Sequence, residues 1–210
     1  MENAASESAT PRRTQRERRE LSYRRMIGAA IELFRRQGSS RTTLAQVGEM
    51  SGYSYGLVSH RFGSKEALVR AVTQQLQADF AKNALPALES LSGLSALIAL
   101  AEAYLRAGAA SDTNAMYALI GEALGPVPEI RPDIAEADRK FRLEVERRIE
   151  QGIRTREIRG DVDAKSYAAI FVGTLRGLVI QRLIEPIAFD LDAACTQVKR
   201  SIEHSLTKSS

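Results

Sequence analysis

Apolar side chains recur along this chain at the three- and four-residue spacing of helices that have one buried face. Thr14 and Glu17 have the spacing of a capping box, which would let a first helix begin early, and Gly38 suits its C-cap. The pattern therefore predicts a long first helix over residues 21–37. Its inward positions are Tyr23, Met26, Ile27, Ala30, Leu33 and Phe34.

Two short helices and one long helix are predicted next. Hydroxyl side chains that can accept hydrogen bonds from free backbone N–H groups precede each of them, and glycines follow the two short ones. The predicted N-caps are Thr43, Ser54 and Ser64. The two short helices end at Gly52 and at about Phe62, and one face of the long helix is marked by Leu68, Val72, Leu76 and Phe80.

The rest of the chain continues the helical spacing, and no strand-like alternation or internal repeat interrupts it. Further helices are predicted over residues 94–107, 114–124, 132–158, 163–185 and 190–206. The sequence thus predicts an all-α protein. We divide it into a flexible basic arm (1–19), a segment that contains the two short predicted helices (20–80) and a larger helical segment (81–210).

Charge is distributed unevenly along the chain. Residues 1–70 hold 13 Lys and Arg against 7 Asp and Glu, whereas the remaining residues hold 17 against 19. Excess positive charge suits a polyanionic partner, although a solvated basic face would give the same count. The arm contains five arginines, for which there are also two alternatives. They are either solvated, or they contact a DNA groove or phosphates. These are Arg12, Arg13, Arg16, Arg18 and Arg19.

Other features of the composition favour a cytoplasmic protein. Cys195 is the single cysteine, so no internal disulfide can form, and residues 1–10 lack the apolar centre of a signal peptide. The most apolar stretch, 166–184, contains Arg176 and Arg182, which would each be costly in a bilayer. We therefore predict a buried helix there and no membrane partner.

The tight glycine turn between the second and third helices is the arrangement that reading a major groove requires. Val47, Val58 and Phe62 can join the two helices through a small apolar hinge. Lys65 and the free backbone amides after Ser64 form a ready phosphate site at a helix N-terminus. The outward residues of the third helix are Ser54, Tyr55, Gly56, Leu57, Ser59 and His60.

Residues 42–68, TTLAQVGEMSGYSYGLVSHRFGSKEAL, resemble the DNA-binding domain of the tetracycline-repressor (TetR) family. The resemblance implies a homodimeric transcription regulator, in which residues 20–80 form the DNA-binding domain and residues 81–210 form the helical ligand-binding and dimerisation domain. It implies that Thr43 and Lys65 contact phosphate and that the outward residues named above contact bases or backbone. Two positions depart from the family pattern: Ser59 replaces a common tyrosine, and Arg61 replaces a common histidine. If it points outward, Arg61 adds a phosphate or guanine ligand.

The helices over 132–158 and 163–185 are the predicted dimer pair. Small residues in the second of them permit close helix approach, and apolar residues occupy more than one of its sides, although an ordinary core helix would also fit. The predicted interface residues are Ala169, Gly173, Arg176, Gly177 and Ile180.

The C-terminal domain is also expected to bind a small-molecule effector of unknown identity, but the same residue types are common in plain cores. The candidate lining residues are Tyr104, Met116, Tyr117, Leu119, Ile120, Glu122, Phe141, Phe171 and Thr174.

Candidate chemistry for catalysis is sparse. The two histidines, His60 and His204, lie far apart in the sequence, and no cofactor or metal motif is present, so we expect no enzyme, no cofactor and no metal. The favoured function is a repressor that a small molecule releases from a palindromic operator. The alternative is a helical small-molecule-binding or enzyme module with a vestigial DNA-binding motif.

Overall fold

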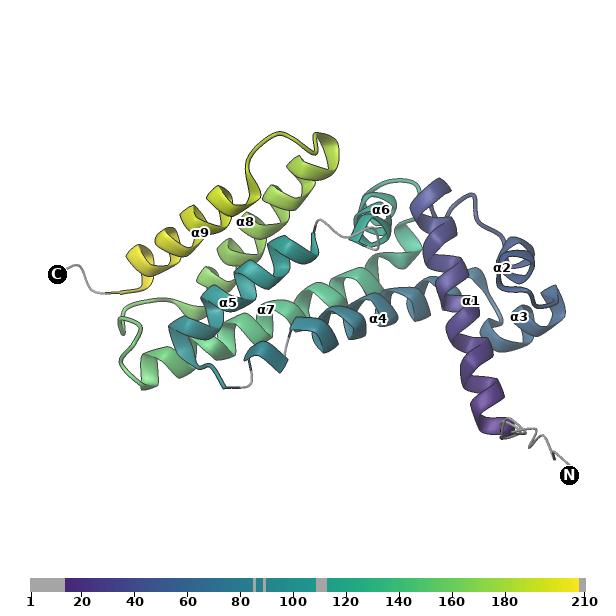
Figure 1. Cartoon of the computed structure of the whole chain (residues 1–210), viewed down its shortest axis with the longest axis horizontal. Helices are drawn as coiled ribbons and strands as arrows, with labels where there is room; N and C mark the ends of the chain where they lie inside the picture. The colour runs from purple at the N-terminus through teal and green to yellow at the C-terminus, as the bar shows by residue number, and fades with distance from the viewer. Residues whose placement is uncertain (1–13, 85, 89, 109–112, 208–210) are drawn as a thin grey trace, which may run out of the picture.

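A computed structural model describes residues 14–84, 86–88, 90–108 and 113–207 of the chain. These residues form helices and turns, and no strand occurs among them, which confirms the all-α prediction. Figure 1 shows α1, α2 and α3 at one end of an elongated molecule and α5, α8 and α9 toward the other, with α4 and α7 running between them. The helices are α1 (Gln15–Gln37), α2 (Leu44–Ser51), α3 (Tyr55–Phe62), α4 (Lys65–Ala84), α5 (Gly93–Ala107), α6 (Thr113–Leu124), α7 (Arg131–Arg154), α8 (Ala164–Ile184) and α9 (Leu191–Leu206), with short 3₁₀ helices η1 (Pro86–Leu88) and η2 (Pro128–Ile130).

Side-chain caps fix where most of these helices begin. Thr14 and Thr43 each form a complete capping box, and Ser54, Asp163 and Asp190 each accept a hydrogen bond from a free backbone N–H. The predicted early start of the first helix at Thr14 is therefore confirmed.

One predicted helix end is wrong, because α7 stops at Arg154 rather than at residue 158. Arg156 adopts a positive φ of 64°, which a continuing helix does not allow. The Ile158 N–H then bonds back to the Gly152 carbonyl at 3.0 Å, and the Ile158 side chain is buried. The chain turns here because Ile158 returns to the core.

The first hydrophobic core joins α1 to α4 with α6. Met26 and Phe34 of α1 are fully buried, and so are Val47 and Val58 of α2 and α3. Ala115, Leu119 and Ala123 of α6 close the same core from beyond residue 80. The first four helices are thus anchored on α6 through shared apolar packing.

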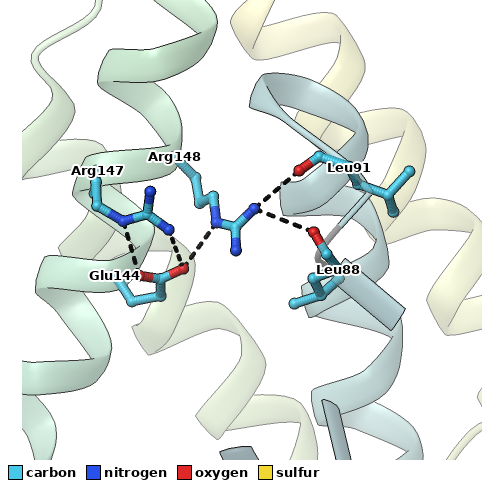
Figure 2. A network of polar contacts seen from close by, with 5 residues as sticks. All are labelled: Leu88, Leu91, Glu144, Arg147 and Arg148. Atoms are coloured by element: carbon cyan, nitrogen blue, oxygen red, sulfur yellow. Dashed lines mark hydrogen bonds and ion pairs between the residues drawn. The ribbon is translucent and has the colours of Figure 1, made fainter. Parts of the chain in front are cut away.

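The second core lies among α5, α7, α8 and α9, and a buried arginine holds the α4–α5 connection against it. Arg148 of α7 is 9% exposed, and its Nη1 donates to the carbonyl oxygens of Leu88 (3.4 Å) and Leu91 (3.0 Å). Its Nε pairs with Glu144 at 2.8 Å, and Arg147 binds the same carboxylate from the surface (Figure 2). Burial alone would raise the pKa of Glu144, but the hydrogen bonds from Arg147 and Arg148 outweigh it and lower that pKa.

Helix α8 has a buried face and an exposed apolar face. Phe171, Leu175 and Val179 pack into the second core, while Ile170 and Ile184 on the other face are 63% and 80% exposed. By length and composition alone, α8 is the one described helix that could cross a membrane, although 28% of its apolar window is buried within the protein. Its unpartnered face requires an explanation.

Candidate nucleic-acid interface

The α2–turn–α3 unit is held by short local contacts. Thr43 caps α2, with its Oγ1 accepting from the Gln46 N–H at 3.2 Å and its own N–H donating to Gln46 Oε1 at 2.9 Å. The turn lies directly over Gly48, where a Cβ atom would come within 2.8 Å of the Tyr53 carbonyl oxygen. The sequence at position 48 therefore decides how closely the turn can approach α2.

Helix α3 presents a buried face and an exposed one. Val58 and Phe62 enter the first core, as predicted for the hinge. Ser59 of the predicted set is half-buried, so the structure places it at the edge of the exposed face rather than at its centre. The exposed members are Ser54, Tyr55, Gly56, Leu57 and His60, with Tyr55 59% and Leu57 41% exposed. Hydroxyl, phenol and imidazole groups in this arrangement can donate to and accept from base edges in a major groove.

Lys65 begins α4 beside this face and already has a protein partner. Its Nζ donates to the Ser40 carbonyl oxygen at 2.6 Å, while Thr43 at the start of α2 is exposed. An ammonium group carries three donors, so two remain available to a phosphate. The contact with Ser40 fixes the position from which Lys65 can reach one.

The guanidinium of Arg61 turns back to α1, so the condition under which Arg61 would add a guanine ligand is not met. It lies over the Tyr23 ring at 5.8 Å from the centroid, and its Nη2 donates to the Arg19 carbonyl oxygen at 3.3 Å. Direct recognition of guanine by this side chain is not supported by that orientation. Instead, Arg61 joins the last turn of α3 to the second turn of α1.

A groove of about 620 Å³ lies along this junction, and we call it the arginine groove. The sequence indicates a basic arm but not a groove, because the groove forms only when α1 and α3 lie together. Arg12 and Arg13 of that arm lie outside the described residues. The lining residues of the arginine groove are Gln15, Arg16, Arg19, Glu20, Tyr23 and Arg61.

A carboxylate from α6 holds the turn between α1 and α2. Glu122 accepts from the backbone N–H groups of Ser39 and Ser40, each at 3.0 Å, and from both hydroxyls, with the Ser40 hydroxyl at 2.9 Å. Gly38 has a φ of +78°, which favours glycine, and a Cβ there would lie 2.5 Å from the Glu122 Oε1 atom and displace that side chain. We call these contacts the Glu122 latch.

The latch places the Glu122 charge where it is stabilised. Partial burial alone would raise the pKa of Glu122, but the hydrogen bonds from Ser39 and Ser40 outweigh it and hold this pKa below its ordinary value. Glu122 was a candidate pocket residue, and the structure corrects that assignment because its carboxylate faces α1–α2. The Ser40 carbonyl also binds Lys65, so one serine connects α6 to a candidate phosphate ligand.

Three other candidate pocket residues do come together, in an aromatic cluster with Phe80. The Tyr104 and Phe141 rings stack at 5.2 Å, and Phe80 meets both edge-on at 5.5 and 5.9 Å. The Tyr104 and Tyr117 hydroxyls lie 3.0 Å apart, and burial, reinforced by Tyr104, raises the pKa of Tyr117. These rings fill the space between them in this structure.

The remaining pocket and interface candidates are spread over α6 and α8. Met116 and Ile120 are half-buried on α6, whereas Leu119 and Phe171 are buried in the first and second cores respectively. Thr174 is exposed on α8. Ala169, Gly173 and Ile180 are exposed on α8, and Gly177 is half-buried.

Arg176, a predicted interface residue, has an ionic partner within its own chain. Its guanidinium forms an ion pair with Asp138 of α7 in the same chain, and its Nε atom is buried without a hydrogen-bond partner among the described residues. Arg176 therefore faces α7 and the aromatic cluster, and it influences the Tyr117 hydroxyl electrostatically.

A second groove, of about 320 Å³, lies between α5 and α9 and includes Cys195 in its lining. None of the candidate pocket residues lines this groove or the arginine groove. In the part of the chain that the structure describes, no group of three or more His, Cys, Asp or Glu side chains is placed to hold a metal ion.

Two protein-family models match this chain, one in its N-terminal half and one in its C-terminal part. Residues 26–72 match the model of bacterial regulatory proteins of the tetR family, and residues 94–207 match that of the C-terminal part of BetI-type transcriptional repressors. The second match alone spans more than half of the chain. The search of curated protein sequences found no match to this chain.

Solved structures share the fold at low sequence identity. A candidate TetR-family transcriptional regulator from Rhodococcus sp. is 16% identical, with a TM-score of 0.80 over 90% of this chain and 100% of that one. FadR of Bacillus subtilis, solved with stearoyl-CoA, is 17% identical, with a TM-score of 0.75 over 88% and 99%. NalD, the secondary repressor of the MexAB-OprM efflux pump of Pseudomonas aeruginosa, is 18% identical, with a TM-score of 0.71 over 92% and 100%.

Proposed function

Since this chain belongs to the tetR family of bacterial regulatory proteins and is a DNA-binding transcriptional regulator, we propose that it acts as a cytoplasmic repressor, a homodimer that leaves its operator when a small molecule binds. The observation that carries this proposal is the division of α3 into two faces. Val58 and Phe62 anchor one face, and the polar side chains of the other are free to meet DNA.

The exposed face of α3 enters the major groove in this proposal. Ser54, Tyr55 and His60 supply hydrogen bonds or ring contacts to base edges, and the lack of a side chain at Gly56 lets the backbone approach. Leu57 supplies apolar contact, and Ser59 at the edge of the face contacts the backbone. Thr43 and Lys65 hold phosphates on either side, which sets the register of the helix on the duplex.

A second copy of the chain covers the exposed face of α8. Ile170, Ile180 and Ile184 are 63%, 42% and 80% exposed, and Gly173 between them allows another helix to approach closely. Apolar residues of this kind are buried in homodimer interfaces. Two copies related by a two-fold axis would place their α3 helices about 34–36 Å apart, in successive major grooves of a palindromic operator.

The effector site in this proposal is the aromatic cluster around Tyr104, Tyr117 and Phe141. A ligand with apolar surface would separate these rings, and a hydrogen-bond acceptor on it would satisfy the buried Nε atom of Arg176. The FadR relative was solved with stearoyl-CoA, so a ligand that carries a long apolar acyl chain can bind a protein of this fold.

Helix α6 links that site to the DNA-binding helices. Tyr117 lies only five residues before Glu122 on the same rigid helix, a rise of about 7.5 Å. A ligand that displaces Tyr117 would therefore also move the Glu122 latch, and with it the turn that carries Ser40. Release requires only that the ligand bind the displaced arrangement more tightly by a few kcal/mol.

Binding to a selected operator tests the proposal. A duplex is selected from random sequences with the wild-type protein, and its affinity is measured for Tyr55→Ala and Lys65→Ala at several salt concentrations. We expect a loss of about 1–3 kcal/mol for Tyr55→Ala, and for Lys65→Ala a salt slope that is smaller by about one unit. Lys82→Ala, an exposed residue at the far end of α4, is the control and should bind as the wild type does.

Two outcomes would count against this function. Unchanged affinity in both variants would remove the assignment of α3 and Lys65 as DNA contacts. A promoter that carries the selected duplex should be less active when the protein is present, and higher activity would show an activator instead of a repressor.

A further inference from the structure

The arginine groove lies outside the helix-turn-helix, on the first three turns of α1. We propose that it binds the sugar-phosphate backbone of the DNA that flanks each operator half-site, with Arg16 and Arg19 as the phosphate ligands. This inference rests on the proposed function, because it requires α3 to be docked in the neighbouring major groove. It assigns a role to residues that precede the matched DNA-binding segment, which begins at residue 26.

The charges of the groove are available to a polyanion. Neither Arg16 nor Arg19 forms a side-chain ion pair with any acidic residue among those that the structure describes, and both residues are exposed. The nearby carboxylates have other partners: Glu20 pairs with Arg24 at 3.0 Å, and Glu17 accepts from the Thr14 backbone N–H at 2.7 Å. A phosphate in the groove would therefore meet two guanidinium groups whose charge is not already neutralised.

Contacts between α1 and α3 fix the position of the groove relative to α3. Arg61 of α3 stacks on Tyr23 and donates to the Arg19 carbonyl, and the Tyr23 ring lies 5.9 Å from that of Phe62. The capping box at Thr14 keeps α1 helical through the groove residues. Docking of α3 therefore carries Arg16 and Arg19 to one defined place without any further ordering of the chain.

The direction of α1 leads away from the centre of the helix-turn-helix. Figure 1 shows its first turns, in purple, extending past α3 toward the N-terminal end of the described chain. His60, an exposed residue of the α3 face, immediately precedes Arg61 at the edge of the groove. The groove thus continues the proposed DNA surface along the duplex, where its arginines would meet phosphates that position the protein without reading the sequence.

The test compares a selected operator duplex in two lengths, one trimmed to the symmetric sequence and one extended by about 10 base pairs, one helical turn, on each side. Wild-type protein should bind the extended duplex more tightly. In Arg16→Ala/Arg19→Ala that advantage should disappear, with affinity for the extended duplex falling about tenfold and the salt slope falling by about two units. Affinity for the trimmed duplex should stay within about twofold.

Two further variants separate charge at this place from charge in general. Arg25→Ala/Arg36→Ala removes the same charge from other positions of α1 that do not line the groove, and it should retain the preference for the extended duplex. Arg16→Lys/Arg19→Lys should retain the salt slope, because lysine still releases counterions from the phosphates. Circular dichroism of each variant checks that α1 remains helical.

The outcomes are distinct for the two proposals. If the wild type binds its operator but Arg16→Ala/Arg19→Ala shows the same affinity and salt slope on the extended duplex, the groove does not hold DNA and the proposed function stands. If the wild type selects no duplex at all, the repressor function fails and this inference fails with it.

Discussion

The Glu122 carboxylate is a single residue on which two parts of the molecule depend. It lies 83 residues from Ser39 in the sequence and accepts from two serines that precede α2. No periodicity in the sequence could show this, because a glutamate among the apolar residues of α6 is equally consistent with a polar group in a pocket. The direction of its side chain becomes known only when α6 packs against α1.

Replacement of Glu122 should make the stability of the protein less dependent on pH. Because its pKa in the folded protein is lower than its ordinary value of 4.5, the carboxylate stabilises the fold above about pH 4.5, and this contribution is lost as the pH falls below it. In Glu122→Gln we expect the free energy of unfolding to be lower by about 1 kcal/mol at pH 7. Urea unfolding should show that this difference becomes smaller as the pH falls below about 4.5.

Glu129→Gln is the matched control, since Glu129 is exposed on η2. Its stability should follow that of the wild type at both pH values. A difference for Glu122→Gln that stays constant between pH 7 and pH 3 would mean that shape rather than charge holds the latch.

Arg148 and Arg147 are neighbours in the sequence with very different surroundings. Arg148→Met should lower the free energy of unfolding by about 2–3 kcal/mol, because the carbonyl oxygens of Leu88 and Leu91 would lose their donor inside the protein. Arg147→Met, whose side chain is 54% exposed, should cost less than about 1 kcal/mol. Equal losses in chemical denaturation would contradict the role of the buried guanidinium.

At the scale of elements, caps and glycines explain why so many helix positions could be predicted. Thr14, Thr43 and Asp163 are local signals, readable within four residues, and the helices begin where they predict. The end of α7 depends instead on Ile158 returning to the core, which is a tertiary effect. The arginine groove is likewise tertiary, because it needs α1 beside α3.

Replacement of Gly48 tests how closely the turn before α3 packs against α2. Gly48→Ala would place a methyl group 2.8 Å from the Tyr53 carbonyl and 3.3 Å from the Tyr55 nitrogen, so the turn must shift. We expect thermal unfolding to show a loss of about 1–3 kcal/mol, together with weaker operator binding.

Gly28→Ala provides the opposite case in a neighbouring helix. Its Cβ would meet nothing within 4 Å in the middle of α1, so alanine should stabilise the protein by about 0.5–1 kcal/mol. Equal stability of Gly48→Ala and Gly28→Ala would contradict the inference that the turn approaches α2 too closely for a side chain at position 48.

For the whole molecule, the exposed face of α8 decides whether two DNA-binding units can act together. Ile170→Asp/Ile184→Asp places charge on that face without entering the core, so the mass in solution should fall from twice 23.1 kDa toward 23.1 kDa. Leu124→Asp, at a residue that is 74% exposed on α6, should leave the dimer intact. Light scattering of the eluting proteins measures both, and an unchanged mass for the α8 variant would place the dimer contact elsewhere.

The sequence could indicate which helix carries this face but not how it is oriented. Ala169, Gly173 and Ile180 are exposed as an interface requires, whereas Arg176 turns inward to Asp138. Apolar residues on more than one side of α8 conceal its buried face, and only its packing on α5 and α7 separates the two. The role of the aromatic cluster is equally hard to predict from the sequence, because stacked aromatic rings also occur in an ordinary core.

The central claim, that two copies each place α3 in a major groove of one duplex, is tested most directly by the spacing of the half-sites. Wild-type affinity is measured for the selected palindromic duplex and for one with about 5 additional base pairs, half a helical turn, at its centre. We expect the insertion to weaken binding by at least about 100-fold, because the second half-site then faces away from the second α3. Equal affinity for the two duplexes would contradict it.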